Sequence, residues 1–223
     1  SCQKELIEYE KGDVKICIEQ GEQWLHDFPL FLGINKKNPP QIAIWLEDTQ
    51  GNYLSTVYVT HKIATQSWQA SGGNRRKEAL PHWCYSRGVK YDDGLYLPTK
   101  KEPLIDGISG ATPHESFNIK LNPATALKKF VVKIEINHST DFNEAFPKSA
   151  KDGEANYSGG KEGSRQPAIV YAANVDLSSG EKSFEANLMG HSSPDGSSGE
   201  VNKDTSGLTT ALHIVKRITV IIQ

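Results

Sequence analysis

Apolar and polar residues alternate along much of this chain, with the period of two that is typical of half-buried β-strands. In the stretch DVKICIE (13–19), Val14, Ile16 and Ile18 fall on one face, against polar neighbours. Further strands are predicted in ESFNIKL, KKFVVKIEIN, PAIVYAANVDL, KSFEANLM and RITVII, which turn residues separate. Short strands at this spacing, with few helical patterns between them, predict an all-β fold, an antiparallel β-sandwich.

Two turns between predicted strands are typical of β-hairpins. The stretch PQIAIWLEDTQGNYLSTVYVTHK (40–62) places Ile42, Ile44 and Leu46 on one face and then turns at DTQGN. Gly51 supplies the positive φ that such a turn requires. A second hairpin is predicted over DLSSGEKSF (176–184), with Gly180 at its tip.

Helical patterns are sparse. NRRKEAL (74–80) predicts two turns of helix ended by Pro81, and DTSGLTTALHIVKR (204–217) predicts one or two turns before the final strand. Two long loops run from about residue 69 to 106 and from about 141 to 166. Loops of this length are usually binding surfaces, covers over an open sheet edge, or mobile segments.

Composition and charge argue against nucleic acid as a partner. The chain has 223 residues, enough for one substantial core, and its formal net charge is -2. Lys and Arg are spread along the chain, so no broad basic field is available to neutralise phosphates. No apolar stretch approaches the ~18 residues that a membrane-spanning helix needs.

The cysteines bear on the cellular compartment. Cys2 precedes the polar stretch QKELIEYEKGD, where a bacterial lipoprotein carries its acylated cysteine just past the signal peptide. We expect lipid on Cys2 to anchor the protein to a membrane, in the periplasm or at the cell surface; an ordinary cysteine is the alternative. Cys17 and Cys84 are then either a disulfide or two buried thiols. Residues 1–22 would hold the anchor and the first strand, and residues 23–223 one elaborated sandwich domain.

Several stretches resemble, in the same order, a family of predicted periplasmic bacterial proteins. They are PQIAIWLEDTQGNYLSTVYVT, RRKEALPHW, DGISGATP, QPAIVYAANVDL, MGHSSPDG and DTSGLTTALHIVKRITV, and they span roughly residues 40 to 222. The family is a domain of unknown function, often encoded near a flavin transferase that attaches FMN to proteins outside the cytoplasm. The resemblance implies an exported protein and, through weaker similarity to the flagellar hook-capping module, an immunoglobulin-like sandwich.

The stretch DGISGAT also resembles the Asp-x-x-Ser/Thr-Gly-Ala-Thr signature of covalent FMN carriers, such as flavoprotein subunits of sodium-pumping and electron-bifurcating respiratory complexes. The defined positions are filled by Asp106, Ser109, Gly110, Ala111 and Thr112. The resemblance implies a phosphodiester between Thr112 and FMN, with the flavin carrying out the redox chemistry. Carriers usually continue with Ser or Thr, whereas Pro113 and His114 follow here.

A purely structural turn is the alternative interpretation of DGISGAT, because glycine and proline favour such a loop before a strand. In both interpretations we expect residues 106–112 to form an exposed turn before a strand that begins near Glu115. We also expect the Thr112 hydroxyl to be accessible to solvent, as a transferase would require.

Other candidate sites are weaker. The candidate metal ligands lack the spacing of a zinc site; they are His82, Cys84, His114, His191 and His213. MGHSSPDGSSGEVNKD (189–204) lacks the carboxylate alternation of a calcium loop, so we interpret it as a solvated turn cluster. GISGAT lacks the nucleophile elbow of a serine hydrolase. Trp24 and Trp45 are expected in the core, whereas Trp83, together with His82 and His191, is our candidate for a ligand surface.

Two functional hypotheses follow. The first is an exported, envelope-anchored, non-catalytic interaction or scaffold module. The second is an extracytoplasmic electron-transfer protein that carries FMN covalently on Thr112, with a flavin transferase or an envelope redox protein as its partner.

Overall fold

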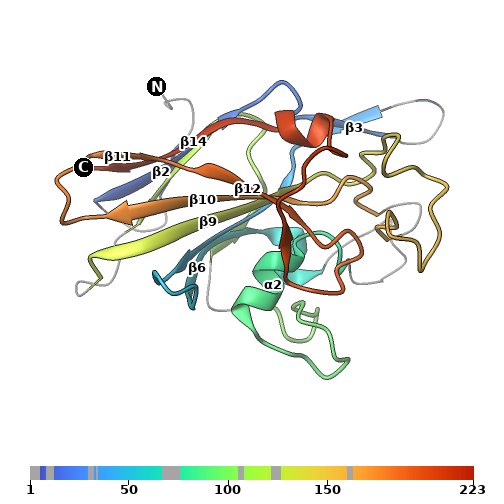
Figure 1. The fold of residues 1–223 in the computed structure, drawn as a ribbon, viewed down its shortest axis with the longest axis horizontal. Coiled ribbons are helices and arrows are strands. Elements are labelled where there is room, and N and C mark those ends of the chain that lie inside the picture. Colours follow the sequence, from blue (N-terminus) through green and yellow to red (C-terminus); the bar gives the residue numbers. More distant parts are fainter. Residues whose placement is uncertain are drawn as a thin grey trace.

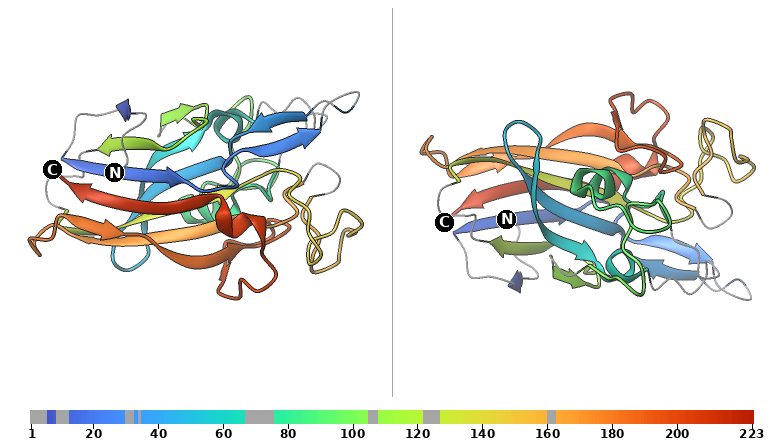
Figure 2. Two further views of the ribbon diagram at one scale, coloured as in Figure 1. Left: turned by 90° about the horizontal axis from the view of Figure 1, so that it is seen from above. Right: turned by 90° about the horizontal axis from the view of Figure 1, so that it is seen from below.

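The computed structural model describes residues 6–8, 13–29, 33, 35–66, 76–104, 108–121, 127–159 and 163–223. Within these residues, two β-sheets pack face to face (Figure 1, Figure 2). Most strand pairs are antiparallel, and the parallel pairs are β1 with β8 and β6 with β7. The predicted all-β, antiparallel sandwich with long loops and short helices is therefore confirmed.

The smaller sheet has five strands in the order β1-β8-β2-β14-β11. These are β1 (Leu6–Glu8), β2 (Val14–Gln20), β8 (Phe117–Leu121), β11 (Ser183–Glu185) and β14 (Val215–Ile222). The larger sheet has seven strands in the order β13-β12-β10-β9-β5-β6-β7. These are β5 (Gln41–Glu47), β6 (Tyr53–Thr60), β7 (Ile108–Gly110), β9 (Lys129–Asn137), β10 (Ile169–Asp176), β12 (Asn187–Ser192) and β13 (Val201–Asn202). A separate pair consists of β3 (His26–Pro29) and β4 (Asn35–Asn38).

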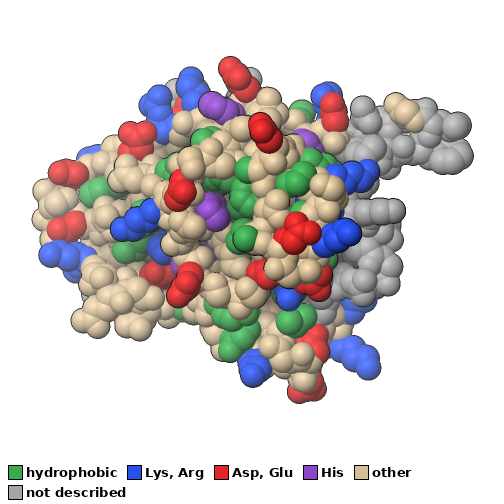
Figure 3. All heavy atoms as spheres, turned by 45° about the vertical axis from the view of Figure 1, so that its right-hand side comes forward, with side chains coloured by type: hydrophobic (Ala, Val, Ile, Leu, Met, Phe, Trp, Pro, Cys, Tyr) green, Lys and Arg blue, Asp and Glu red, His purple; other side chains and the backbone are tan. Residues whose placement is uncertain are grey.

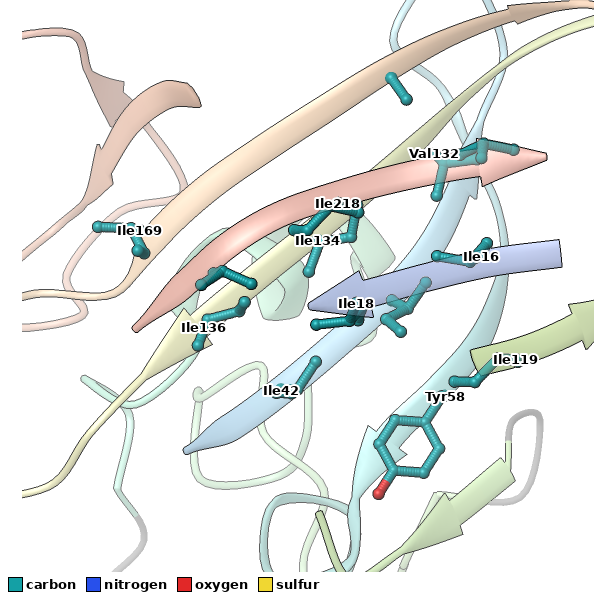
Figure 4. Close-up of a cluster of buried hydrophobic side chains, with 14 of the residues drawn as sticks. Ile16, Ile18, Ile42, Tyr58, Ile119, Val132, Ile134, Ile136, Ile169 and Ile218 are labelled. Carbon is teal, nitrogen blue, oxygen red and sulfur yellow. The ribbon is translucent and has the colours of Figure 1, made fainter. Parts of the chain in front are cut away.

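The main core lies between the two sheets and is built by the period-two alternation. Ile16 and Ile18 of β2 meet inward-facing residues of the larger sheet such as Ile42 and Ile134 (Figure 4). In the larger sheet itself, Ile44 of β5 lies opposite Ile134 of β9. Each such aliphatic side chain stabilises the fold by about 1.5–3 kcal/mol when it is fully buried.

A second apolar layer covers the outer face of the larger sheet. Ala43 and Trp45 of β5 point away from the main core and pack with Leu80, Trp83 and other residues in and around helix α2 (Pro81–Arg87). Figures 1 and 2 show α2 on this outer face. Because β5 is covered on both faces, its outward-facing residues are buried as well as its inward-facing ones.

The first predicted hairpin is confirmed and the second is wrong. Strands β5 and β6 pair directly, and Gly51 in the turn has φ +88°. The turn around Gly180 instead leads from β10 in the larger sheet to β11, which pairs with β14 in the smaller sheet. Sequence chemistry there specifies a tight turn, with Asp176 accepting bonds from Ser178, but it does not specify which sheet receives the next strand.

Of the helix predicted over residues 74–80, residues 74 and 75 lie outside the described residues, and residues 76–80 are not helical. The predicted end is wrong as well, because Pro81 begins a helix where we expected it to end one. Proline suits the first helical position, since its fixed φ is helical and the N–H that it lacks would have no partner within the helix. Near the C-terminus, the 3-10 helix η3 (Thr210–His213) supplies the predicted helical turn before β14. A further short helix, α1 (His61–Thr65), follows β6.

Cys17 and Cys84 are buried thiols, and no disulfide joins them. Cys17 lies in β2 of the smaller sheet, where its thiol donates to the Asn118 side-chain oxygen at 2.7 Å, and Cys84 lies in α2. Cys2 lies outside the described residues. Among the helices of the described chain, none has the length and apolar character to cross a membrane.

Candidate functional site

The DGISGAT motif is only partly an exposed turn. Asp106 lies outside the described residues, while Ser109 and Gly110 belong to β7, in register with Val59 and Thr60 of β6. The following strand, β8, begins at Phe117. Ser109 and Ala111 are exposed, as expected for this segment.

Thr112 is buried, with 4 % of its surface exposed, so the expectation of an accessible hydroxyl is wrong. Its Oγ1 lies 3.0 Å from Oγ1 of Thr60. The Thr60 hydroxyl donates to the Ile42 carbonyl at 3.2 Å, which leaves Thr112 as the donor to Thr60. The Thr112 hydroxyl is therefore turned toward the sheet and engaged there.

Two long-range hydrogen bonds explain this burial. The indole N–H of Trp24 donates to the Pro113 carbonyl at 2.9 Å, and the Tyr58 hydroxyl donates to the Gly110 carbonyl at 2.9 Å. Together they hold the segment around Thr112 against the sandwich. Glycine and proline predicted a loop here, but the partners that turn it inward are distant in sequence.

A buried carboxyl group fixes α2 to the larger sheet. Glu135 lies on the outer face of β9 and is fully buried. It accepts backbone hydrogen bonds from His82 at 3.0 Å and Trp83 at 2.8 Å, and a third from the Ser192 hydroxyl. Glu135 thereby satisfies N–H groups in the first turn of α2, whose N-cap residue, Leu80, makes no side-chain cap.

Burial raises the pKa of Glu135 to about 7, although its three hydrogen bonds and the charge of Lys133 act in the opposite direction. This is the range of a general base. Both oxygens are nevertheless occupied by backbone and hydroxyl donors, and no part of the side chain reaches solvent. The geometry suits a positioning residue that holds α2 and β12 together.

A second set of polar contacts lies beside Glu135. The Lys133 ammonium lies 3.0 Å from Nε2 of His82 and 3.6 Å from Oε1 of Glu47, and the Trp45 indole N–H donates to Glu47 at 2.7 Å. Because an ammonium group only donates, Nε2 of His82 accepts, and Nδ1 carries the proton that is donated to the Gly199 carbonyl at 2.7 Å. Burial and the Lys133 charge lower the pKa of His82 to about 4, so this histidine is neutral at pH 7.

Partly exposed tyrosines and an arginine lie on α2 and on the loop after it. Tyr85 and Tyr96 stack with their ring centroids 4.5 Å apart, and the Tyr85 hydroxyl donates to the Ser197 carbonyl at 3.0 Å. Arg87 donates to the Tyr91 hydroxyl at 2.9 Å, and Val89 is 40 % exposed. We call Tyr85, Arg87, Val89, Tyr91 and Tyr96 the α2 surface. Figure 3 shows acidic and basic side chains interspersed over the visible face of the molecule, without a field of one sign.

The predicted ligand surface is not formed as expected. Trp83 is fully buried in the second apolar layer, where its indole N–H donates to the Thr56 hydroxyl at 3.0 Å. His191 is also buried, and His82 is half-buried beneath the loop that contains Gly199. The sequence predicted these residues at the protein surface because the segments that cover them are remote in sequence and could not be identified from it.

The stretch 189–204 forms β12, a turn and β13. In the turn, Asp195 accepts from the Ser193 hydroxyl at 2.9 Å and from the Ser197 backbone at 3.0 Å, as expected for a turn cluster. Within the described part of the chain, no group of three or more His, Cys, Asp and Glu side chains is placed to hold a metal ion.

Fold and site together define an antiparallel β-sandwich with a helix-bearing outer layer held by a buried carboxyl group. No protein-family model, curated protein or solved structure matches the chain.

Proposed function

We propose that this protein is an exported, envelope-anchored interaction module without catalytic activity, and that the α2 surface binds its partner. The observation that carries the proposal is the attachment of α2 to the sandwich through Glu135. A helix of seven residues has little stability of its own, so this anchoring holds its partly exposed side chains, Tyr85 and Arg87, in a fixed position. Preorganised side chains lose less entropy when a partner binds.

The composition of the α2 surface supports the same proposal. Tyrosine and arginine are enriched among the residues that dominate binding energy in protein interfaces. Tyr85 and Tyr96 are half-buried and stacked, and Arg87 is held by Tyr91. Such side chains offer contact area at low entropic cost.

Site-specific photo-crosslinking in the cell envelope tests the proposal. A photoreactive residue at Val89 should give a defined adduct with one partner, and Tyr85→Ala should abolish it. Leu188 on β12 is the matched control, because it is exposed to a similar extent, 41 % against 40 % for Val89, but lies outside the α2 surface. Equal adducts from both positions, or an adduct that persists in Tyr85→Ala, would contradict the assignment of the surface.

A second candidate function is extracytoplasmic electron transfer with FMN on Thr112. Its support is the complete motif, with Ser109 and Ala111 exposed beside Thr112. Since the Thr112 hydroxyl is buried, a transferase would need the segment around it to open. Co-expression with a flavin transferase, followed by intact mass and in-gel fluorescence, tests this function. An adduct that is lost in Thr112→Ala would establish it; no adduct while a known carrier is labelled in the same cells would reject it.

A further inference from the structure

The long segment between β9 and β10 contains a buried arginine that forms no ion pair with any described residue. Arg165 is 1 % exposed, and its Nε and Nη1 atoms make no hydrogen bond. Its guanidinium carbon lies 4.7 Å from the ring centroid of Phe142, a favourable contact that leaves these N–H groups without acceptors. A guanidinium keeps its charge in proteins, so its burial requires compensation.

The neighbouring carboxylates are engaged elsewhere. Burial lowers the pKa of Arg165, and the charges of Tyr157 and Glu78 act in the opposite direction. Oε1 of Glu78, however, is 3.1 Å from Nε of Arg76 in a buried ion pair. Asp141 pairs with Arg165 along the backbone, yet its carboxyl group accepts from the Thr210 hydroxyl at 2.7 and 2.8 Å. Among the described residues, no carboxylate forms an ion pair with Arg165, and Glu78 acts on its charge only from a distance.

The backbone around this arginine adopts a costly conformation. Arg165 has φ +68° and Thr140 has φ +61°, a region that side-chain-bearing residues seldom adopt. The two residues lie on adjoining segments that backbone hydrogen bonds join. The backbone N–H of Thr140 donates to the Gly163 carbonyl at 2.7 Å, and the backbone N–H of Asp141 donates to the Ser164 carbonyl at 3.2 Å. The Thr140 hydroxyl is likewise buried without a hydrogen-bond partner. Strain of this kind persists only where the surroundings maintain it, and it concentrates at binding sites.

We propose that Arg165 is the cation of an internal site for a small oxyanion, with the Thr140 hydroxyl as a second donor. An oxyanion supplies both the acceptors that the guanidinium lacks and the negative charge that a water molecule could not supply. The exposed Lys148, whose ammonium lies 5.9 Å from the ring centroid of Phe142, adds positive charge nearby. The ligand would join the segments 139–142 and 163–166, on which the conformation of the loop between β9 and β10 depends.

Thermal unfolding with inorganic phosphate as the probe, at ionic strength held constant with chloride, tests the site. The midpoint should rise with the logarithm of phosphate concentration, as binding to the native state requires, and Arg165→Gln should remove this rise. Arg217→Gln is the matched control, because Arg217 is half-exposed and paired with Glu19. Phosphate and sulfate also stabilise proteins generally, so only the part of the rise that Arg165→Gln removes counts. Parallel titrations with sulfate and acetate distinguish a tetrahedral oxyanion from a carboxylate.

Calorimetry on the wild-type protein keeps the test decisive even where Arg165→Gln does not fold. Saturable heat with phosphate, sulfate or acetate in the millimolar range, weakened in Arg165→Lys and Thr140→Val, would support the site. The proposal is overturned by the absence of saturable binding for all three anions, by equal stabilisation of wild type and Arg165→Gln, or by a crystal grown in phosphate that shows only water at Arg165.

Discussion

The carboxyl group of Glu135 accepts a hydrogen bond from the backbone N–H of Trp83 at 2.8 Å, across 52 positions of sequence. This contact links the central part of the larger sheet to the helix that covers its outer face. Because the same carboxyl group also receives the His82 N–H and the Ser192 hydroxyl, one side chain of β9 fixes both α2 and β12.

Replacing Glu135 by glutamine should change the pH dependence of stability. Burial raises the native pKa from 4.5 to about 7, so between these values the native state holds a proton that the unfolded state has lost. The stabilising contribution of Glu135 is thus complete below pH 4.5 and is lost as the pH rises through about 7, by about 3 kcal/mol in total.

Glu135→Gln cannot titrate, and its amide nitrogen cannot accept an N–H from α2. It should therefore be about 1–3 kcal/mol less stable than wild type at pH 5. The deficit should shrink toward pH 8. Urea unfolding at several pH values measures this, with the exposed Glu181→Gln as control. Parallel pH profiles for wild type and Glu135→Gln would contradict the raised pKa.

His138 should have the opposite effect on the pH dependence of stability, lowering the free energy of unfolding as the pH falls. Burial, with a smaller effect from the charge of His26, lowers the pKa of His138 from 6.5 to about 3. Below pH 6.5 His138 becomes protonated in the unfolded state but stays neutral in the native state. The free energy of unfolding therefore falls as the pH falls toward 3. His138→Gln can still donate to the Gln23 carbonyl, and its unfolding free energy should depend less on pH, by about 1.4 kcal/mol per pH unit. An unchanged slope in urea unfolding between pH 4 and 6 would count against this assignment.

Gly199 should tolerate no side chain. A Cβ there would lie 2.4 Å from Cβ of Tyr85, so Gly199→Ala must push the loop away from α2. The loss is expected to be about 1–3 kcal/mol in chemical denaturation. Gly207→Ala is the control, because its Cβ would meet Cβ of Ala145 at 3.3 Å, a much milder contact. Equal losses for the two variants would show that the approach of this loop to α2 is not tight.

Lipid attachment at Cys2 remains a prediction from sequence. Expression of the full-length gene with labelled palmitate should give labelled protein, and Cys2→Ala should be unlabelled. Cys17→Ala and Cys84→Ala should keep the label, because both thiols are buried within the fold. Unlabelled wild type, or label that survives Cys2→Ala, would reject the anchor.

The sequence predicted the strands better than their partners. Alternation placed Ile16 and Ile18 in the core, and turn chemistry located the β5–β6 hairpin. The stretch KSFEANLM also alternates, yet its two halves join different sheets, because Phe184 pairs with Val220 while Ala172 pairs with Asn187. Alternation reports which side of a strand is apolar and carries no information about which sheet the strand joins.

The polar groups beneath α2 were missed for a related reason. In KKFVVKIEIN, alternation assigns Lys133 and Glu135 to the solvent side of β9. The cover by α2 buries Glu135 and leaves Lys133 half-buried. One signal was available in QIAIWLE, where Ala43 and Trp45 make the second face of β5 apolar as well. A strand that is apolar on both faces indicates that other elements cover both faces of the sheet there. The neighbouring strand should then be expected to be covered on both faces too.

The burial of Thr112 depends on Trp24, and a pair of tryptophan variants tests this. Trp24→Phe keeps most of the aromatic packing but removes the N–H that donates to the Pro113 carbonyl at 2.9 Å. Loss of one such bond is worth about 0.5–1.5 kcal/mol, so local opening of residues 109–116 should become up to about ten times more frequent. Hydrogen exchange of peptides from this segment measures the change.

Trp83→Phe is the matched control, because it removes an equivalent indole bond, to Thr56 at 3.0 Å, in the other apolar layer. Faster exchange around Thr112 in Trp24→Phe alone would show that this one bond keeps the hydroxyl turned inward. Equal acceleration in both variants would instead mean that the segment opens only with the whole sandwich.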